Sequence, residues 1–253
     1  MTNIVSALAG ARESLSAGET PALDAELLLG HVLGRPRTFL HAWPELALDA
    51  RAKARFEALV ARRAAGEPAA LLIGRREFWS LDLTVTPDTL VPRPETERLV
   101  ELTLERLPPG TRRRVADLGT GSGNVALAIA RERPACRVVA SDCSPQALVV
   151  ARANARALGI GNVEFVRGDW CAALPGESFD AIVSNPPYIR DGDPHLRKLR
   201  FEPRGALVGG RDGLAQIRRI GASAPDRLRP GGWLLLEHGH DHGESVPALL
   251  VSL

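Results

Sequence analysis

From residue 114 onward, short apolar runs alternate with segments of helical pattern, and this alternation limits the possible folds more than any other feature. Strands are expected at 115–118, 137–140, 163–166, 179–183 and 232–237, with helices over 125–133 and 144–158. Such alternation predicts a mostly parallel sheet with helices on both faces. Sheets of this kind bind ligands beyond the carboxyl ends of their strands, where the strand order reverses. We therefore expect an α/β domain whose site lies at the strand ends.

The sequence Ser184-Asn185-Pro186-Pro187-Tyr188 follows the expected strand 179–183. Two successive prolines end the strand, because proline fixes φ and lacks the N–H that a sheet requires. The loop then offers carbonyl oxygens, and the Asn185 side-chain oxygen is a further acceptor. Such acceptors can hold both hydrogens of a planar NH2 group and turn its nitrogen toward an electrophile. For an isolated Pro-Pro pair, the alternative is a strand end and a turn without function.

A glycine turn, Gly119-Thr120-Gly121-Ser122-Gly123, lies between the first expected strand and its helix. Its glycines let the backbone turn sharply and approach a ligand closely. The spacing departs from the dinucleotide fingerprint and from the phosphate-binding loop. An adenosine-bearing ligand without a pyrophosphate fits better, because Asp142 ends the next strand where a carboxylate can accept both hydrogen bonds of a ribose diol. The alternative role for Asp142 is helix capping.

Asp169-Trp170 ends the third expected strand. Here a carboxylate can receive an adenine amine and an indole can cover the ring. The alternative for Trp170 is a core aromatic residue without contact to a ligand. The placement of these residues on successive strand ends supports one ligand site.

The first 75 residues have the pattern of a small helical domain. A helix is expected from the cap Thr20 and Pro21 to Gly34, and another from Asp49 to Gly66. One interpretation of this domain is that it binds a partner or substrate. The alternative is a purely structural role.

Residues 76–98 change character and are expected to form a hairpin or linker. The segment 78–85 alternates like a strand, and prolines at 87, 92 and 94 interrupt the residues after it. A helix is expected over 95–107. The expected divisions are thus a helical domain at 1–75, a hairpin or linker at 76–98 and the α/β domain at 99–253.

Composition excludes several classes of protein. The chain of 253 residues is long enough for one α/β domain and a small accessory domain. Its apolar runs are too short to cross a bilayer and no signal peptide is evident, so we expect a cytoplasmic protein without membrane contact. The net charge of +2 gives no argument for nucleic acid. Cys136, Cys143 and Cys171 lack metal-ligand spacing.

Three alternating histidines stand in the segment 238–242, His-Gly-His-Asp-His. Metal binding is one interpretation of this segment. A solvated loop after the fifth strand is the favoured one, so we expect no metal.

The motifs at the strand ends resemble the S-adenosylmethionine methyltransferases that modify planar nitrogens. Five further segments resemble the HemK/PrmC family, the glutamine N5-methyltransferases of peptide chain release factors. They are LDAELLL at 23–29, REFW at 76–79, VPRPETE at 91–97, FEP at 201–203 and LEHG at 236–239. The resemblance covers about residues 20 to 245. The Asn-Pro-Pro-Tyr motif alone is shared with DNA adenine methyltransferases, and the combination with the other segments is more specific.

This resemblance implies a Rossmann-like class I methyltransferase sheet and S-adenosylmethionine as cofactor. The residues at 119–123 would surround its methionine part, and Asp142 would hold the ribose. Asp169 and Trp170 would lie at the adenine end. The substrate would be the glutamine of a Gly-Gly-Gln loop in a release factor, docked with help from the helical domain. Asn185 and the Pro186 carbonyl would bind its side-chain amide, with Pro187 and Tyr188 beside them and no general base evident.

The resemblance also implies two more strands beside the fifth. We expect this sequence to lack them, so that the methyltransferase domain is short at its C-terminal end. Three alternatives to release-factor methylation remain. They are methylation of a glutamine in a ribosomal protein, methylation of a nucleic-acid amine, which requires a basic groove, and an inactive, truncated binding module.

Overall fold

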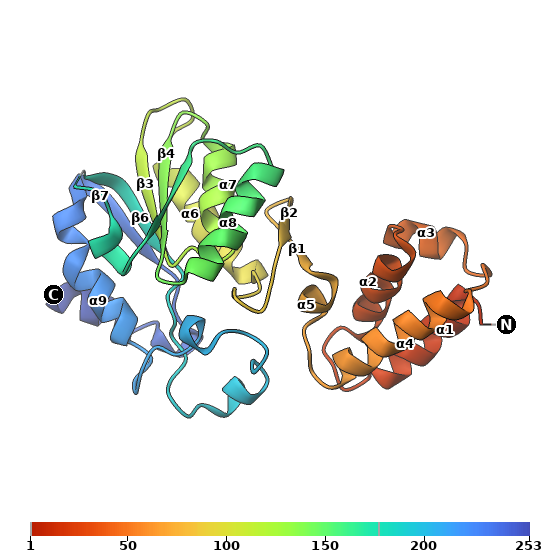
Figure 1. The fold of residues 1–253 in the computed structure, drawn as a ribbon. Helices are drawn as coiled ribbons and strands as arrows, with labels where there is room; N and C mark the ends of the chain where they lie inside the picture. The colour runs from red at the N-terminus through yellow and green to blue at the C-terminus, as the bar shows by residue number, and fades with distance from the viewer. Residues whose placement is uncertain (1, 177) are drawn as a thin grey trace. The chain divides into compact units, whose positions relative to one another are not determined.

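The computed structural model describes residues 2–176 and 178–253 and divides the chain into two compact units, Met1–Gly74 and Arg75–Leu253. The first unit is helical, and the second contains all the named strands (Figure 1). Contacts group residues 76–98, which we expected to form a hairpin or linker, with the second unit. Within the described residues, no helix has the length and apolar character needed to cross a membrane.

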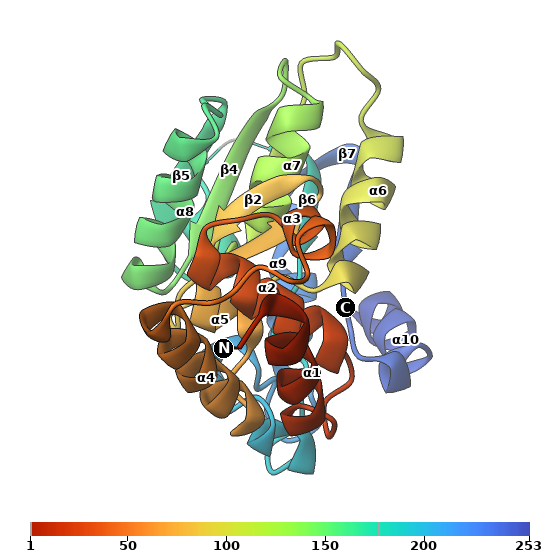
Figure 2. The same ribbon diagram turned by 90° about the vertical axis from the view of Figure 1, so that its right-hand side faces the viewer.

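Five helices form the first unit and enclose a core of their own. They are α1 (Ile4–Ser14), α2 (Pro21–Leu33), α3 (Arg37–Ala42), α4 (Ala50–Ala64) and α5 (Ala69–Ile73). Helices α1, α2 and α4 pack together (Figure 2), and Leu8, Leu28 and Phe56 belong to the buried cluster that they enclose. Burial of these apolar helix faces is the main source of the unit's stability.

The helix ends depend on local residues. Pro21 occupies the first position of α2, and Gly34 ends it with φ of 62°, in the left-handed region that glycine adopts without strain. Asp49 caps α4 by accepting a hydrogen bond from the Ala52 amide at 2.7 Å. Thr20 occupies the N-cap position, as expected, but its side chain makes no capping hydrogen bond. The start of α2 therefore depends on Pro21.

A buried carboxylate joins three of the helices. Glu26 on α2 is 6% exposed and faces Arg12 of α1 at 3.1 Å and Arg37 of α3 at 2.6 Å, with His41 at 3.4 Å. Burial raises the pKa of this carboxyl, but hydrogen bonds and charges from Arg37 and His41 outweigh burial and hold it below its usual value. The Glu26 charge thus stabilises the first unit.

We expect Glu26→Ala to destabilise the first unit by about 1 to 2 kcal/mol. This loss of stability is at the lower end of the range for removing a charged hydrogen-bonded group, because Arg12 and Arg37 are half exposed and can form hydrogen bonds to water instead. Faster hydrogen exchange of the α1 and α2 amides would measure the effect. Glu13→Ala, at an exposed position of α1, is the matched control and should leave the exchange unchanged.

The second unit begins with a hairpin, β1 (Arg75–Phe78) and β2 (Leu81–Thr84), paired antiparallel. The single strand that we expected over 78–85 is wrong, because the chain reverses at Trp79 and Ser80. Both residues have positive φ, 53° and 56°, as in the two-residue turns that normally use Asn-Gly. Here the Glu97 carboxylate accepts a hydrogen bond from the Trp79 amide at 2.9 Å and stabilises the turn.

Five parallel strands form the main sheet, in the order β5-β4-β3-β6-β7. They are β3 (Arg114–Leu118), β4 (Arg137–Asp142), β5 (Val163–Arg167), β6 (Phe179–Ser184) and β7 (Leu228–Leu236). The strand order reverses between β3 and β6, since β4 and β5 lie on one side of β3 and β6 and β7 on the other. The expected α/β sheet with a small helical N-terminal unit is confirmed.

Helices cover both faces of this sheet (Figure 1). The α-helices and 3-10 helices (η) of the second unit are, in chain order, η1 (Pro94–Thr96), α6 (Glu97–Arg106), α7 (Asn124–Glu132), α8 (Pro145–Ala157), η2 (Trp170–Ala173), η3 (Pro194–Arg197), η4 (Arg204–Ala206), α9 (Ala215–Ser223), η5 (Pro225–Arg227), η6 (His240–His242) and α10 (Ser245–Ser252). Val115 packs toward α6 and α7, while Ala116 packs toward α9 on the other face. Within the described residues β7 pairs with β6 alone, so the two further strands of the resemblance have no counterpart there.

One side chain joins the hairpin to the glycine turn. Asn154 on α8 is buried, and its amide accepts a hydrogen bond from the Thr84 amide at 2.8 Å and donates to the Thr84 carbonyl at 3.0 Å. The same amide group donates to the Ser122 carbonyl at 2.9 Å. Asn154 therefore fixes the glycine turn relative to β2.

Candidate active site

A cavity of about 300 Å³ lies at the carboxyl ends of the parallel strands. Its lining includes predicted site residues that follow four different strands: Gly119 and Gly121 after β3, Asp142 at the end of β4, Asp169 and Trp170 after β5, and Asn185 and Pro187 after β6. The volume is that of a small-molecule site. The cavity therefore lies where the strand order reverses, as the fold predicts.

The glycine turn forms one wall of this cavity. Gly119 has φ of 73°, and a Cβ on it would lie 3.1 Å from the Trp170 ring. At Gly121 a Cβ would meet no atom within 4 Å, so this residue borders open space. The absence of a side chain at Gly119 lets the Trp170 ring pack against the turn, and its absence at Gly121 leaves the adjoining space available to a ligand.

Asp142 is held at the rim of the cavity by two backbone amides. Its carboxylate accepts hydrogen bonds from Gly121 at 2.9 Å and from Ser144 at 2.8 Å. The cap of α8 is Ser144, whose hydroxyl accepts from the Ala147 amide at 3.1 Å. Asp142 is thus fixed in place while each of its oxygens retains capacity to accept another hydrogen bond.

Asp169 and Trp170 line the cavity after β5. The Trp170 indole N–H donates to Gln216 of α9 at 3.0 Å, which sets the plane of the ring. Asp169 is half exposed and forms an ion pair with Arg219, also on α9. Both partners on α9 line the cavity as well, and neither belongs to a local pattern that could have predicted it.

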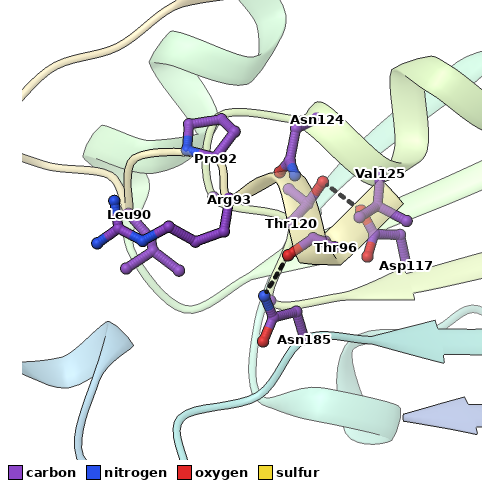
Figure 3. A pocket seen from close by; sticks show the side chains of 11 residues that line it. Leu90, Pro92, Arg93, Thr96, Asp117, Thr120, Asn124, Val125 and Asn185 are labelled. Atoms are coloured by element: carbon purple, nitrogen blue, oxygen red, sulfur yellow. Dashed lines mark hydrogen bonds between the residues drawn. The ribbon is translucent and has the colours of Figure 1, made fainter. Parts of the chain in front are cut away.

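Asn185 borders both this cavity and a small adjoining crevice of about 30 Å³ (Figure 3). Its side-chain nitrogen donates to the Thr96 hydroxyl at 3.1 Å, and its oxygen points away from Thr96. Asn185 therefore has a side-chain acceptor that is not used by Thr96. Sequence reasoning missed Thr96, because it precedes Asn185 by 89 residues and no local pattern links the two.

Four predicted site residues line neither the cavity nor the crevice: Ser122, Gly123, Pro186 and Tyr188. The Ser122 and Gly123 side of the turn faces the protein, and a Cβ on Gly123 would meet Leu127 at 3.1 Å. Pro186 is buried, and Tyr188 is half-buried with its hydroxyl 3.3 Å from Glu237. Burial, together with the charge and hydrogen bond of Glu237, raises the pKa of Tyr188 to about 12.

Asp117 at the end of β3 lines the crevice but was not predicted as a site residue. Its carboxyl accepts hydrogen bonds from Thr120 at 2.7 Å and from the Ala126 amide at 3.1 Å. Burial raises its pKa to about 7; these two hydrogen bonds act against the shift and the charge of Asp142 adds to it. Asp117 is therefore a group that changes protonation near neutral pH.

A second carboxylate supports the wall of the crevice. Glu202 is buried, accepts a hydrogen bond from the Val91 amide at 2.8 Å and pairs with Arg93. Arg93 lines the crevice (Figure 3). The two segments that resembled a known family, at 91–97 and 201–203, are thus in direct contact.

The histidine segment at 238–242 is solvated at His240 and Asp241, as expected, but not at His242. His242 is only 2% exposed. Its ring packs so closely against Gly213 that a Cβ on this glycine would lie 2.8 Å from the ring. Among residues 2–176 and 178–253, no group of three or more His, Cys, Asp or Glu is arranged to hold a metal ion.

Comparisons with known proteins agree with this architecture. The PrmC N-terminal domain matches residues 6–74, and the methyltransferase small domain matches residues 96–199. A solved methyltransferase from Pyrococcus furiosus shares the fold at 22% identity, with a TM-score of 0.52 over 78% of this chain and 85% of its own.

Curated relatives are much closer in sequence. The release factor glutamine methyltransferase of Coxiella burnetii is 53% identical over 232 residues, which are 92% of this chain and 84% of that protein. The protein of the same name from Vibrio cholerae is 50% identical over 257 residues, covering 99% of this chain and 89% of its own. Identity of this extent across both units shows that the chain belongs to the release factor glutamine methyltransferase family.

Proposed function

We propose that this protein transfers a methyl group from S-adenosylmethionine to the side-chain nitrogen (N5) of the glutamine in the Gly-Gly-Gln loop of peptide chain release factors. The observation that carries the proposal is the acceptor oxygen of Asn185, left available at the cavity and followed by a loop whose prolines offer only carbonyls. Because the substrate belongs to translation, we place the reaction in the cytoplasm.

The cavity fits S-adenosylmethionine in the chemistry of its lining. The Gly119 to Gly121 part of the turn would border the methionine part, Asp142 would accept from the ribose hydroxyls, and Trp170 would cover the adenine. Asp169 is a weaker candidate for the adenine amine, because it is paired with Arg219. When bound, this cofactor supplies a sulfonium-activated methyl carbon that is open to a nucleophile.

The residues of the loop after β6 would work mainly by orientation. An amide nitrogen is a poor nucleophile, so holding it in line with the methyl carbon supplies much of the acceleration. Asn185 and the Pro186 carbonyl would accept the two amide hydrogens, while Pro187 and Tyr188 would pack beside the glutamine side chain. These hydrogen bonds strengthen as positive charge develops on the nitrogen.

The proposal is tested by incubating the protein with S-adenosylmethionine labelled in its methyl group and with a purified release factor. We expect one label per release factor, mapped by mass spectrometry to the glutamine of the Gly-Gly-Gln loop. Label on a ribosomal protein or on nucleic acid instead would favour the corresponding alternative. Failure to bind S-adenosylmethionine in calorimetry would favour the inactive binding module.

We expect Asp142→Ala to weaken S-adenosylmethionine binding about 100-fold, because loss of a carboxylate that accepts two ribose hydrogen bonds costs about 2 to 3 kcal/mol. Titration calorimetry measures the change. Asp226→Ala, at an exposed position of η5, is the control and should bind normally. Unchanged affinity in Asp142→Ala would contradict the ribose assignment.

A further inference from the structure

Gln216 of α9 lines the cavity beside Trp170, and its side-chain oxygen is already used by the protein. The Trp170 indole N–H donates to Oε1 at 3.0 Å, and the Arg219 guanidinium donates to the same oxygen at 3.2 Å. Both partners can only donate, so the Gln216 atom that meets them is the carbonyl oxygen, and its two lone pairs are both taken. The NH2 group is therefore the polar group that Gln216 has left to offer a ligand.

Arg219 also connects this amide to the carboxylate of Asp169. Its second terminal nitrogen pairs with Oδ2 of Asp169. Among residues 2–176 and 178–253, no side chain or backbone group hydrogen-bonds to the Gln216 NH2 group or to Oδ1 of Asp169. The cavity of about 300 Å³ thus has a fixed donor, a carboxylate acceptor and an aromatic ring on three linked side chains.

These three groups are complementary to adenine. The base has a flat ring that an indole can cover, an exocyclic amine that donates and ring nitrogens that accept. An amine cannot pair with another NH2 group, so Gln216 can hydrogen-bond only to a ring nitrogen of the base. Oδ1 of Asp169 can accept from the amine. Hypoxanthine has a carbonyl oxygen in place of that amine and would bring an acceptor to the carboxylate.

We propose that Gln216 is a specificity-determining residue for the cofactor, because its NH2 group donates to a ring nitrogen of the adenine. Trp170 and Arg219 are the positioning residues that hold the amide in the required orientation. The inference rests on the proposed function for the identity of the ligand. The orientation of the amide is a property of the free protein, since both groups that hold its oxygen belong to the chain.

The binding test uses Gln216→Glu. Glutamate keeps an oxygen for Trp170 and Arg219 and replaces the NH2 group by an oxygen that only accepts, so two acceptors face each other at the base. We expect the calorimetric affinity for S-adenosylhomocysteine, whose sulfur is uncharged, to fall about 10- to 100-fold. Gln146→Glu makes the same change at an exposed position of α8 that does not line the cavity, and this matched control should bind normally.

Analogues of the ligand test the contact from the other side. In three of them, N1, N3 or N7 of the adenine is replaced by C–H, which cannot accept a hydrogen bond. One of the three should bind the native protein about 10-fold more weakly than S-adenosylhomocysteine does. The same analogue should bind Gln216→Glu at least as tightly as S-adenosylhomocysteine, because the opposed acceptor is gone. The inference is overturned if no analogue shows this reversal.

A third measurement needs no ligand. The chain has four tryptophans, so nitrogen-15 NMR spectra contain few indole signals, and that of Trp170 is identified by its loss in Trp170→Phe. We expect the Trp170 indole proton to exchange slowly with solvent in the native protein and in Gln216→Glu, and faster in Gln216→Leu. Equal exchange rates in all three proteins would overturn the orientation of the amide and the inference with it.

The inference and the proposed function fail in different ways. Unchanged affinity in Gln216→Glu, with normal binding by the native protein, would overturn the inference alone. A native protein that does not bind S-adenosylhomocysteine in calorimetry would overturn the proposed function as well.

Discussion

Asn185→Ala should reduce methylation of the release-factor glutamine at least about 1,000-fold, while the affinity for S-adenosylmethionine changes by no more than a few-fold. The large effect on kcat results from the loss of the side-chain acceptor that orients the amide nitrogen; removing one such oriented group typically lowers kcat by about 100- to 1,000-fold, and misalignment adds to that loss. Single-turnover kinetics with saturating cofactor, together with calorimetry, measure the two quantities separately.

Asn185→Asp serves as the companion variant. Aspartate keeps the acceptor oxygens but loses the N–H that donates to Thr96. We expect an activity between those of the native protein and Asn185→Ala. Equal rates for Asn185→Ala and the native protein would refute the acceptor role.

Asp117 should make the stability of the second unit depend on pH. Its pKa is about 7 in the folded protein and near 3.8 when unfolded, so folding favours the protonated form. The stability linked to this group is fully present below about pH 4 and is lost as pH rises to about 7. Three pKa units correspond to at most ~4 kcal/mol.

Asp117→Asn removes this titration and provides the comparison. Urea unfolding of both proteins without cofactor, at pH 4.5 and 7.5, should show the stability of the native protein falling relative to the variant as pH rises. Subtracting the variant also removes contributions of other carboxyls, such as Glu26, whose lowered pKa acts in the opposite sense. A constant difference between the two proteins would show that Asp117 is ionised throughout this range.

Most of the main sheet could be predicted from local sequence. The run 179–183 and the two prolines define the end of β6 without reference to any other segment. The glycine turn and the cap at Ser144 are equally local. Because parallel strands place their carboxyl ends at one edge, predicting these ends was sufficient to bring Gly119, Asp142 and Asn185 to one cavity.

The predictions that failed concern contacts between distant segments. Trp79 and Ser80 adopt positive φ although neither residue favours it, because Glu97 on another element accepts a hydrogen bond from the turn. Thr96 was likewise invisible as a site residue, since only the fold brings it to Asn185. Burial of His242 depends on packing against Gly213 rather than on its own polar segment.

The Asn154 amide has a consequence for engineering this enzyme toward altered cofactors. Because one planar group satisfies backbone atoms of both β2 and the glycine turn, Asn154→Asp loses both donated hydrogen bonds and Asn154→Leu loses all three. Variant libraries that enlarge the cavity should therefore leave Asn154 unchanged. They should instead vary Cys143 or Ala147, whose side chains line the cavity but do not make these hydrogen bonds.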